Sequence, residues 1–152
     1  MNKLIISLLS ILLTAISCNI KDDFERKDEL INYIKKLNIV DYENKNLLVV
    51  FLTGGCGECN EETIGVIDDL DSESKYHDYK KILIISDNNS EYRDLLNDCD
   101  FLIIEETFYN LSKYGINFYN NFIAELSNNF KIVKWEWLKN ENIGKIKRQF
   151  YL

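Results

Sequence analysis

The segment that most constrains the fold of this chain is an apolar run followed at once by glycines and two cysteines. Residues 47–52 read Leu-Leu-Val-Val-Phe-Leu, the continuous apolar pattern of a strand that is buried on both faces. Gly54 and Gly55 then predict a turn, and Cys56 and Cys59 follow at C-x-x-C spacing. Because the periodicity after them predicts a helix over residues 56–70, the two cysteines are expected in its first turn.

This position favours thiol chemistry. The first turn of a helix has N–H groups without intrahelical partners and carries a partial positive charge, and both features stabilise a thiolate. Cys56, at the mouth of the helix, is expected to be the more exposed sulfur, and Cys59, one turn further along, the more enclosed one. The pattern therefore predicts thiol–disulfide exchange.

The first residues indicate where this chemistry would take place. Lys3 precedes a nearly continuous apolar run over residues 4–13, and small or apolar residues 15–17 lead to Cys18. This resembles a bacterial lipoprotein signal, which is cleaved before a cysteine that becomes lipidated. An ordinary signal peptide or an N-terminal anchor helix is the alternative, although the apolar run is short for a membrane span. The polar residues 19–23 and Asn19 after Cys18 favour an anchor in the outer membrane, on either of its faces.

Charge and size restrict the function further. The full chain has a net charge of −7, and the loss of Lys3 by cleavage would make it one unit more negative. An acidic domain of this kind argues against nucleic acid and anionic lipid as partners. The apolar (46%) and aromatic (12%) fractions fit one folded domain. We expect a signal peptide over residues 1–17, a lipidated cysteine, tether and helix over 18–40, and the folded domain over 41–152.

The rest of the chain alternates helical and strand patterns. After the strand at 47–52 and the helix at 56–70, we expect a loop over 72–81, with the single histidine, His77, on its surface. Strands are predicted over 82–85 and 101–104, and helices over 22–37, 91–97 and 139–150. The helix over 22–37 is expected to be capped by Asp22 or Asp23 and to include Phe24. A short helix over 107–114 ends at Gly115, and a hairpin is predicted from strands over 122–126 and 130–137 with a turn at 127–129. The apolar face of its second strand is expected to hold Val133, Trp135 and Trp137. This order predicts an α/β fold, a mixed sheet with helices on both faces.

With its C-x-x-C after the first strong strand, this order resembles the thioredoxin-like superfamily, and most closely its membrane-tethered members in bacterial envelopes. The resemblance covers about residues 41–152 and includes Lys113-Tyr114-Gly115-Ile116, which is similar to the family's Tyr-Gly-Val/Ile element. It implies that Cys56 attacks a disulfide, that Cys59 resolves the mixed disulfide, and that no cofactor is needed. The implied partners are protein thiols or disulfides and an unidentified redox partner.

The sequence departs from the family at three positions. Asn120 occupies the place of the family's cis-proline, so the Tyr119–Asn120 bond is expected to be trans, and these two residues are assigned tentatively to a substrate groove. Gly55 replaces an aromatic residue before the first cysteine, and Val50 replaces a buried acid. Because Glu58 also disfavours a nearby thiolate, we expect the pKa of Cys56 to be lowered less than in strong oxidants and the pair to favour reduction.

Two other interpretations remain open. A thioredoxin-like lipoprotein without turnover could bind a partner through the loop around Tyr119. A metal site could use Cys56, Cys59 and Cys99, with His77 as a fourth ligand, but the ligands lie far apart in sequence and zinc prefers four of them. Cys99 is instead expected to be a half-buried structural thiol.

Overall fold

The structure is a computed structural model that describes residues 24–37, 39, 44–52, 60–86, 98–116 and 120–151. Several predictions fall outside these residues, among them the signal segment with Cys18, the helix expected over 91–97, and the segment with Cys56 and Cys59. Within the described ranges, no helix is long and apolar enough to cross a membrane.

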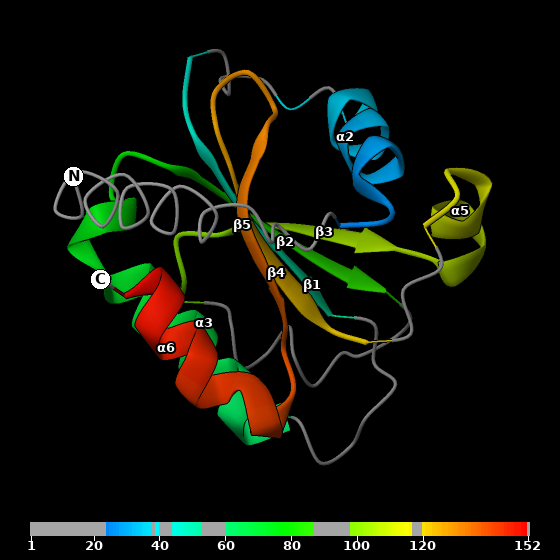
Figure 1. Ribbon diagram of the computed structural model, residues 1–152. Coiled ribbons are helices and arrows are strands. Elements are labelled where there is room, and N and C mark those ends of the chain that lie inside the picture. Colours follow the sequence, from blue (N-terminus) through cyan, green and yellow to red (C-terminus); the bar gives the residue numbers. More distant parts are fainter. Residues whose placement is uncertain are drawn as a thin grey trace, which may run out of the picture.

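A five-stranded mixed sheet forms the centre of the molecule, in the order β3-β2-β1-β4-β5 (Figure 1). Its strands are β1 (Leu47–Leu52), β2 (Lys80–Ser86), β3 (Leu102–Glu106), β4 (Phe122–Leu126) and β5 (Ile132–Trp137). β1 pairs in parallel with β2 and β2 with β3, whereas β4 runs antiparallel to both β1 and β5. The apolar run at 47–52 is the middle strand, and all six of its residues are buried, as its continuous pattern predicted.

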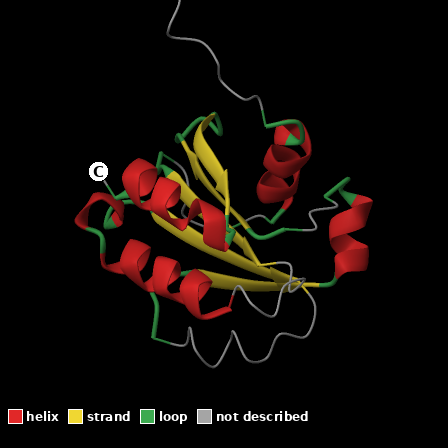
Figure 2. Cartoon of the chain, turned by 60° about the horizontal axis from the view of Figure 1, so that its bottom comes forward, coloured by secondary structure: helices red, strands yellow, loops and turns green. Residues whose placement is uncertain are grey.

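Helices cover both faces of this sheet (Figures 1 and 2). On one face, α3 (Asn60–Ser72) and α6 (Ile143–Phe150) pack on side chains from Leu48, Val50 and Leu52 of β1. On the other, α2 (Lys27–Lys36) and α5 (Phe108–Lys113) pack on Leu47, Val49 and Phe51. The alternation of side chains along β1 therefore divides the core into two clusters, which we name the α3 face and the α2 face. The predicted α/β class and mixed sheet are confirmed.

The first described helix is shorter than predicted. α2 begins at Lys27, and Arg26 occupies its N-cap without a side-chain capping hydrogen bond. Phe24 was expected inside the helix but precedes it, and its ring centroid lies 5.0 Å from that of Trp135. Phe24 is buried in the α2-face cluster, and this packing orients the chain more strongly than continued helix would. The expected caps Asp22 and Asp23 lie outside the described residues.

The segment expected to be a loop over 72–81 is largely ordered structure. Ser72 ends α3, a 3₁₀ turn η2 (Ser74–Tyr76) follows, and β2 already begins at Lys80. Tyr76 is fully buried, and its hydroxyl donates to the carbonyl oxygen of Phe150 at 2.8 Å. The polar residues around Tyr76 are typical of a solvent-exposed loop. Tyr76 is buried instead because it packs against Phe150, which is distant in sequence. The prediction that His77 lies on the surface is confirmed.

The β4–β5 hairpin forms around the predicted turn, with one irregularity. β4 has the predicted limits, whereas β5 begins at Ile132 because Phe130 adopts a positive φ of 61° in the turn. A register shift lies between Glu125 and Leu126, opposite Val133. This bulge moves Ile132 onto the α2 face with Trp135 and leaves Val133 50% exposed, so the expectation that Val133 shares the tryptophan face is wrong.

The remaining elements lie close to their predicted positions. The hydroxyl of Thr107 accepts a hydrogen bond from the backbone N–H of Asn110 at 3.2 Å and caps α5, and Gly115 follows the helix with a φ of 75°. β3 extends to Glu106, two residues beyond the predicted strand, and as an edge strand it is partly exposed. The closing segment forms the turn η3 (Asn140–Asn142) and then α6.

Candidate functional site

The described structure frames the predicted cysteine segment on both sides. β1 ends at Leu52 and α3 begins at Asn60, so Cys56 and Cys59 belong to the connection between the middle strand and the helix that covers it. Because β1, β2 and β3 are parallel, their carboxyl ends share one edge of the sheet. This carboxyl edge is where α/β sheets commonly bind ligands. The two sulfur atoms lie outside the described residues, and the prediction that the helix begins at residue 56 stays a prediction.

The structure brings one of the two predicted groove residues to this same edge. Asn120 is exposed and lies just before β4. β4 begins with Phe122, which pairs with Phe51 near the end of β1, so the antiparallel strand starts where β1 finishes. Asn120 therefore lies at the carboxyl edge, and its assignment to a substrate groove stays a prediction. Tyr119, and with it the Tyr119–Asn120 peptide bond, is outside the described residues.

No acid lies on β1, but a buried one lies two strands away. Val50 is fully buried on the α3 face, where it pairs with Ile123, which in turn pairs with Glu136 of β5. The Glu136 carboxylate forms an ion pair with Lys145 and accepts a hydrogen bond from the side-chain amide of Asn142 at 3.2 Å. Sequence reasoning missed this residue because polar residues alternating along a strand are typical of a solvent-facing side, and here α6 covers that side.

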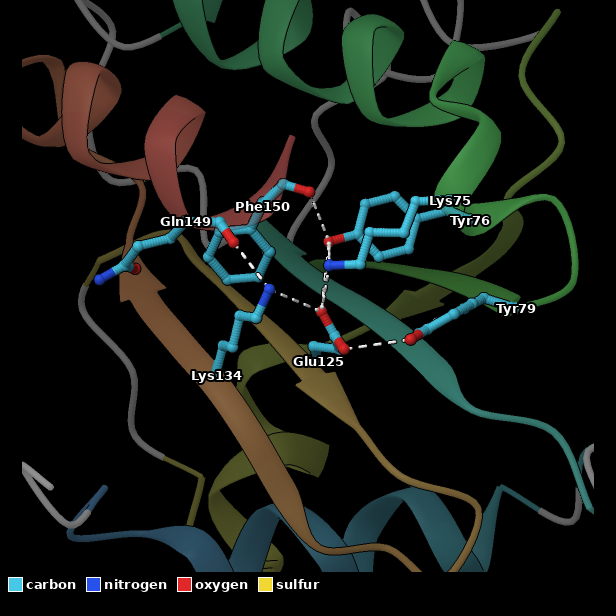
Figure 3. A network of polar contacts seen from close by, with 7 residues as sticks. All are labelled: Lys75, Tyr76, Tyr79, Glu125, Lys134, Gln149 and Phe150. Carbon is cyan, nitrogen blue, oxygen red and sulfur yellow. Dashed lines mark hydrogen bonds and ion pairs between the residues drawn. The ribbon is translucent and has the colours of Figure 1, made fainter. Parts of the chain in front are cut away.

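A second buried carboxylate, Glu125 of β4, is the centre of a polar network (Figure 3). Its Oε2 lies 3.1 Å from Nζ of Lys75 and 3.5 Å from Nζ of Lys134, and its Oε1 accepts a hydrogen bond from the Tyr79 hydroxyl at 3.0 Å. Lys134 also donates to the carbonyl oxygen of Gln149 at 2.7 Å. The network thus ties η2 and the end of α6 to the sheet.

Opposing effects set the protonation of this network. Burial by itself would raise the pKa of Glu125, but the hydrogen bond from Lys75 and the charge of Lys134 outweigh it, so the pKa lies below its usual value. Burial and the neighbouring Lys75 lower the pKa of Lys134. Glu125 pairs with Leu48, near the amino end of β1. Because this is the opposite end of the strand from the cysteine segment, we assign the network to stability.

Cys99 and His77, which were considered as metal ligands together with Cys56 and Cys59, both lie among the described residues. Cys99 is half-buried and packs against the α3-face cluster, which confirms the prediction of a half-buried thiol. Burial raises the pKa of this thiol, so it is a poor nucleophile at neutral pH. In the part of the chain that the structure describes, no three His, Cys, Asp or Glu side chains gather as a metal site would require.

One open pocket of about 300 Å³ is lined by Asp69, Ser72, Glu73, Lys147 and Tyr151. It lies at the C-terminal end of α3 and therefore at the other end of this helix from the cysteine segment. Its side chains mix both charges, and we assign no function to it.

No family model matches the sequence, and a search of curated proteins finds no relative. Solved structures do match. A protein described as the thiol:disulfide interchange protein DsbE from Chlorobium tepidum superposes with a TM-score of 0.54 at 12% identity, over 72% of this chain and 79% of that one. The thioredoxin domain of a thiol-disulfide oxidoreductase from Bacteroides vulgatus gives 0.50 at 15% identity, over 72% and 82%. A secreted disulfide oxidoreductase of Mycobacterium tuberculosis, homologous to Escherichia coli DsbE, gives 0.50 at 9% identity, over 70% and 84%.

The chain has a thioredoxin-like fold. The resemblance inferred from the C-x-x-C, the Tyr-Gly-Ile element and the element order is therefore confirmed for the fold. In this thioredoxin-like domain, Tyr114 is the C-cap of α5, Gly115 follows it, and Ile116 is buried on the α2 face. The superpositions support the fold. Because the sequence identities are low, the activity has to be argued from this chain's own residues.

Proposed function

We propose that this thioredoxin-like protein is a thiol–disulfide oxidoreductase of the bacterial cell envelope, anchored through a lipid on Cys18 and acting through Cys56 and Cys59. The observation that carries the proposal is that the buried middle strand β1 ends at the carboxyl edge of the sheet and that, in the sequence, the C-x-x-C follows this strand and precedes helix α3. The functions named for the superposed structures support the same class of reaction.

The proposed reaction uses only the two cysteines and a substrate disulfide. The Cys56 thiolate attacks one substrate sulfur, which forms a mixed disulfide and releases the other substrate sulfur as a thiolate. Cys59 then attacks Cys56, which closes the protein disulfide and releases the substrate as a dithiol. Two electrons pass from the cysteine pair to the substrate, so a separate thiol reductant must reduce the pair again.

We infer that the pair favours reduction of its substrates. A strongly oxidising pair requires a very stable thiolate in its reduced form. Two residues argue against such stabilisation. Val50 on the strand before the cysteines is apolar and fully buried, and Glu58, between the cysteines in sequence, is expected to disfavour a thiolate. We expect the potential of the pair to lie closer to that of thioredoxin, about −270 mV, than to that of DsbA, about −120 mV.

An insulin-reduction assay tests the activity. Wild type is expected to precipitate insulin chains in the presence of dithiothreitol, and both Cys56→Ser and Cys59→Ser are expected to lose this activity. Cys99→Ser is the matched control and is expected to keep it, because Cys99 is half-buried with a raised thiol pKa. Equal rates for wild type and Cys56→Ser would refute the proposal. Equilibration of the pair with glutathione would then give its potential.

A second candidate is a thioredoxin-like lipoprotein that binds a partner without turnover. The absence of a carboxylate at Val50 favours it, because an internal base at this position would assist deprotonation of a buried thiol. An inactive wild-type protein whose pair does not equilibrate with glutathione would support this candidate. The anchor is tested separately: Cys18→Ala should abolish incorporation of labelled palmitate and release the protein from the outer-membrane fraction.

A further inference from the structure

The two outer strands of the sheet differ in how their free edges are protected. In the described part of the chain, the sheet ends with β3 on one side and with β5 on the other (Figure 1). An outer strand has a row of backbone N–H and C=O groups that no neighbouring strand pairs, and proteins limit unwanted pairing there with bulges, inward-pointing charges, lysines and prolines. A comparison of the two edges therefore shows which of them can accept a further strand.

The edge of β5 has two of these protective features. Its pairing with β4 contains a register shift between Glu125 and Leu126, which interrupts the regular row of backbone groups. The strand also has inward-pointing charges, because Lys134 forms an ion pair with Glu125 and the buried Glu136 forms one with Lys145 of α6. The edge of β5 is therefore poorly suited to pairing with another strand.

The edge of β3 has neither feature. Its register with β2 is regular through all five residues, and the strand contains no lysine, arginine or proline. Three of the five residues are aliphatic, yet no residue of β3 is buried, and Leu102 is 38% exposed. Ile103 packs on the α3 face and Ile104 on the α2 face. A strand added beside β3 would therefore extend the core on both faces of the sheet.

The chain around β3 is acidic. Residues 98–112 contain no Lys, Arg or His and have four acids, which are Asp98, Asp100, Glu105 and Glu106. The first three are exposed and the fourth is partly exposed. Lys81 on the neighbouring strand is buried, and its ammonium group is paired with the carboxylate of Asp71. The edge of β3 thus has an aliphatic half followed by an acidic end, which together suit a segment with apolar and basic residues.

A second copy of this chain does not fit the edge well. Two β3 strands paired antiparallel about Ile104 would place Glu106 opposite Leu102 and Glu105 opposite Ile103 of the other copy. Neither strand supplies a cation for these four carboxylates. Two chains that each have a net charge of −7 also repel each other. Charge complementarity therefore favours a basic segment from a different protein.

We propose that the free edge of β3 binds an extended basic segment of a partner protein as an additional strand of the sheet. The segment runs antiparallel to β3, which is the slightly more stable arrangement. Its basic residues come first, opposite Glu105 and Glu106, and its aliphatic residues follow, opposite residues 102–104. Backbone hydrogen bonds supply the affinity, and the side chains supply the selectivity. This inference goes beyond the proposed redox function and does not depend on it.

Peptide binding to the full chain tests the proposal. The probe is the peptide Lys-Lys-Val-Ile-Val with blocked ends, and the matched control is its reverse, Val-Ile-Val-Lys-Lys. NMR should show the largest amide shifts at residues 102–106, and the reversed peptide should bind at least about tenfold more weakly. Added salt should weaken the binding. Because only alternate residues of a strand bond to a given neighbour, N-methylation of one alternate set of peptide nitrogens should abolish binding, and methylation of the other set should preserve it.

Two lysine substitutions test the edge itself. Leu102→Lys adds a positive charge to β3 and should weaken binding of the basic peptide by about tenfold or more. Val133→Lys adds the same charge to the other outer strand, where Val133 is 50% exposed, and should leave binding unchanged. Urea unfolding establishes that both variants are folded. Glu106→Gln keeps the shape of its side chain, gives a second variant of β3, and should weaken binding by about two- to fivefold.

Several results would overturn the proposal. Equal binding of the two peptides, or of the two methylated forms, would show that charge alone attracts the peptide and that no strand is added. Amide shifts centred on β5, or no shifts up to about 5 mM peptide, would show that the edge of β3 is not a binding site. Sedimentation of a dimer that Leu102→Lys dissociates would identify a second copy of the chain as the occupant instead.

Discussion

Replacement of Glu125 by glutamine should be among the most destabilising single-charge changes in this domain. The substitution keeps the size and planarity of the side chain and removes its charge. Glu125 is only 6% exposed and holds two ammonium groups, one hydrogen-bonded at 3.1 Å and the other at 3.5 Å, together with the Tyr79 hydroxyl. Without the carboxylate, Lys75 and Lys134 would face each other with no negative charge between them.

The magnitude follows from the hydrogen bonds and from the exposure of the lysines. A hydrogen bond to a charged group contributes about 1.5–3 kcal/mol, and removing one partner of a buried ion pair costs about 3–5 kcal/mol. The side chains of Lys75 and Lys134 are 28% and 30% exposed, so both ammonium groups can turn toward water and recover part of this loss. We expect Glu125→Gln to lower the free energy of unfolding by about 2–3 kcal/mol.

Urea unfolding followed by tryptophan fluorescence measures this loss, with Trp135 and Trp137 as reporters. For a urea m-value of about 1–3 kcal/mol/M, a loss of 2 kcal/mol lowers the midpoint by about 0.7–2 M. The matched control is Asp69→Asn, which removes a carboxylate from an ion pair whose two side chains are 52% and 51% exposed. This exposed pair should contribute less than about 1 kcal/mol.

The pH dependence gives a second measurement. The pKa of Glu125 is lower in the folded state than its usual value of 4.5, so its contribution to stability is complete above that value and is lost as the pH falls through the lowered pKa. The difference between wild type and Glu125→Gln should be constant between pH 6 and 8 and should shrink below about pH 4. A loss no larger than that of Asp69→Asn at pH 7 would show that the cost of burying the charges cancels their attraction, and would refute the reasoning.

Three further predictions use other features of the fold. Gly115→Ala should lower the free energy of unfolding by about 1–2 kcal/mol, because Gly115 has a φ of 75° and a Cβ there would lie 3.0 Å from Cγ of Glu29. The control is Gly65→Ala on α3, where a Cβ would meet open space. This substitution should raise the free energy of unfolding by up to about 1 kcal/mol. Equal signs for these two glycines in urea unfolding would contradict this explanation. Lys81→Met should cost about 2–3 kcal/mol, because the buried Nζ lies 2.8 Å from the Asp71 carboxylate, while the neighbouring Lys80→Met should change the midpoint little. Replacement of Val50 by Asp should abolish folding or lower stability by more than 3 kcal/mol, as seen by circular dichroism, because it would place a charge in the fully buried centre of the α3 face; a stable, folded variant would show that this position tolerates an acid.

Local patterns were enough to locate most elements. The apolar run at 47–52, the helical spacing of the residues after it, and the turn residues around 127–129 depend only on neighbours in sequence, and the elements they predicted are present. The boundaries were less accurate where a distant partner decides them. Phe24 packs on Trp135 and lies before the helix in which it was expected, and Tyr76 is buried with its hydroxyl hydrogen-bonded to Phe150. The bulge opposite Val133 changed which residues of β5 point inward.

For the candidate site too, some features could be predicted from the sequence and others could not. The C-x-x-C and the residues at the missing proline and missing acid were visible in the sequence, and the fold brings Asn120 to the edge where β1 ends. The buried carboxylates Glu125 and Glu136 were not foreseen, because an acid on an alternating strand is usually solvent-exposed. Only the packing of α6 across that face makes these acids internal.

By itself, the sequence determined the succession of strands and helices and the C-x-x-C spacing of Cys56 and Cys59 after a buried strand, since these depend on short-range periodicity and spacing. Only the tertiary structure decided which polar residues are buried and which of them meet. Lys75 and Tyr79 lie far from Glu125 along the chain, and they meet its carboxylate because β4 pairs with β1 and places Glu125 beside the segment around η2. Contacts of this kind are set by the energy of the whole core, which no local pattern records.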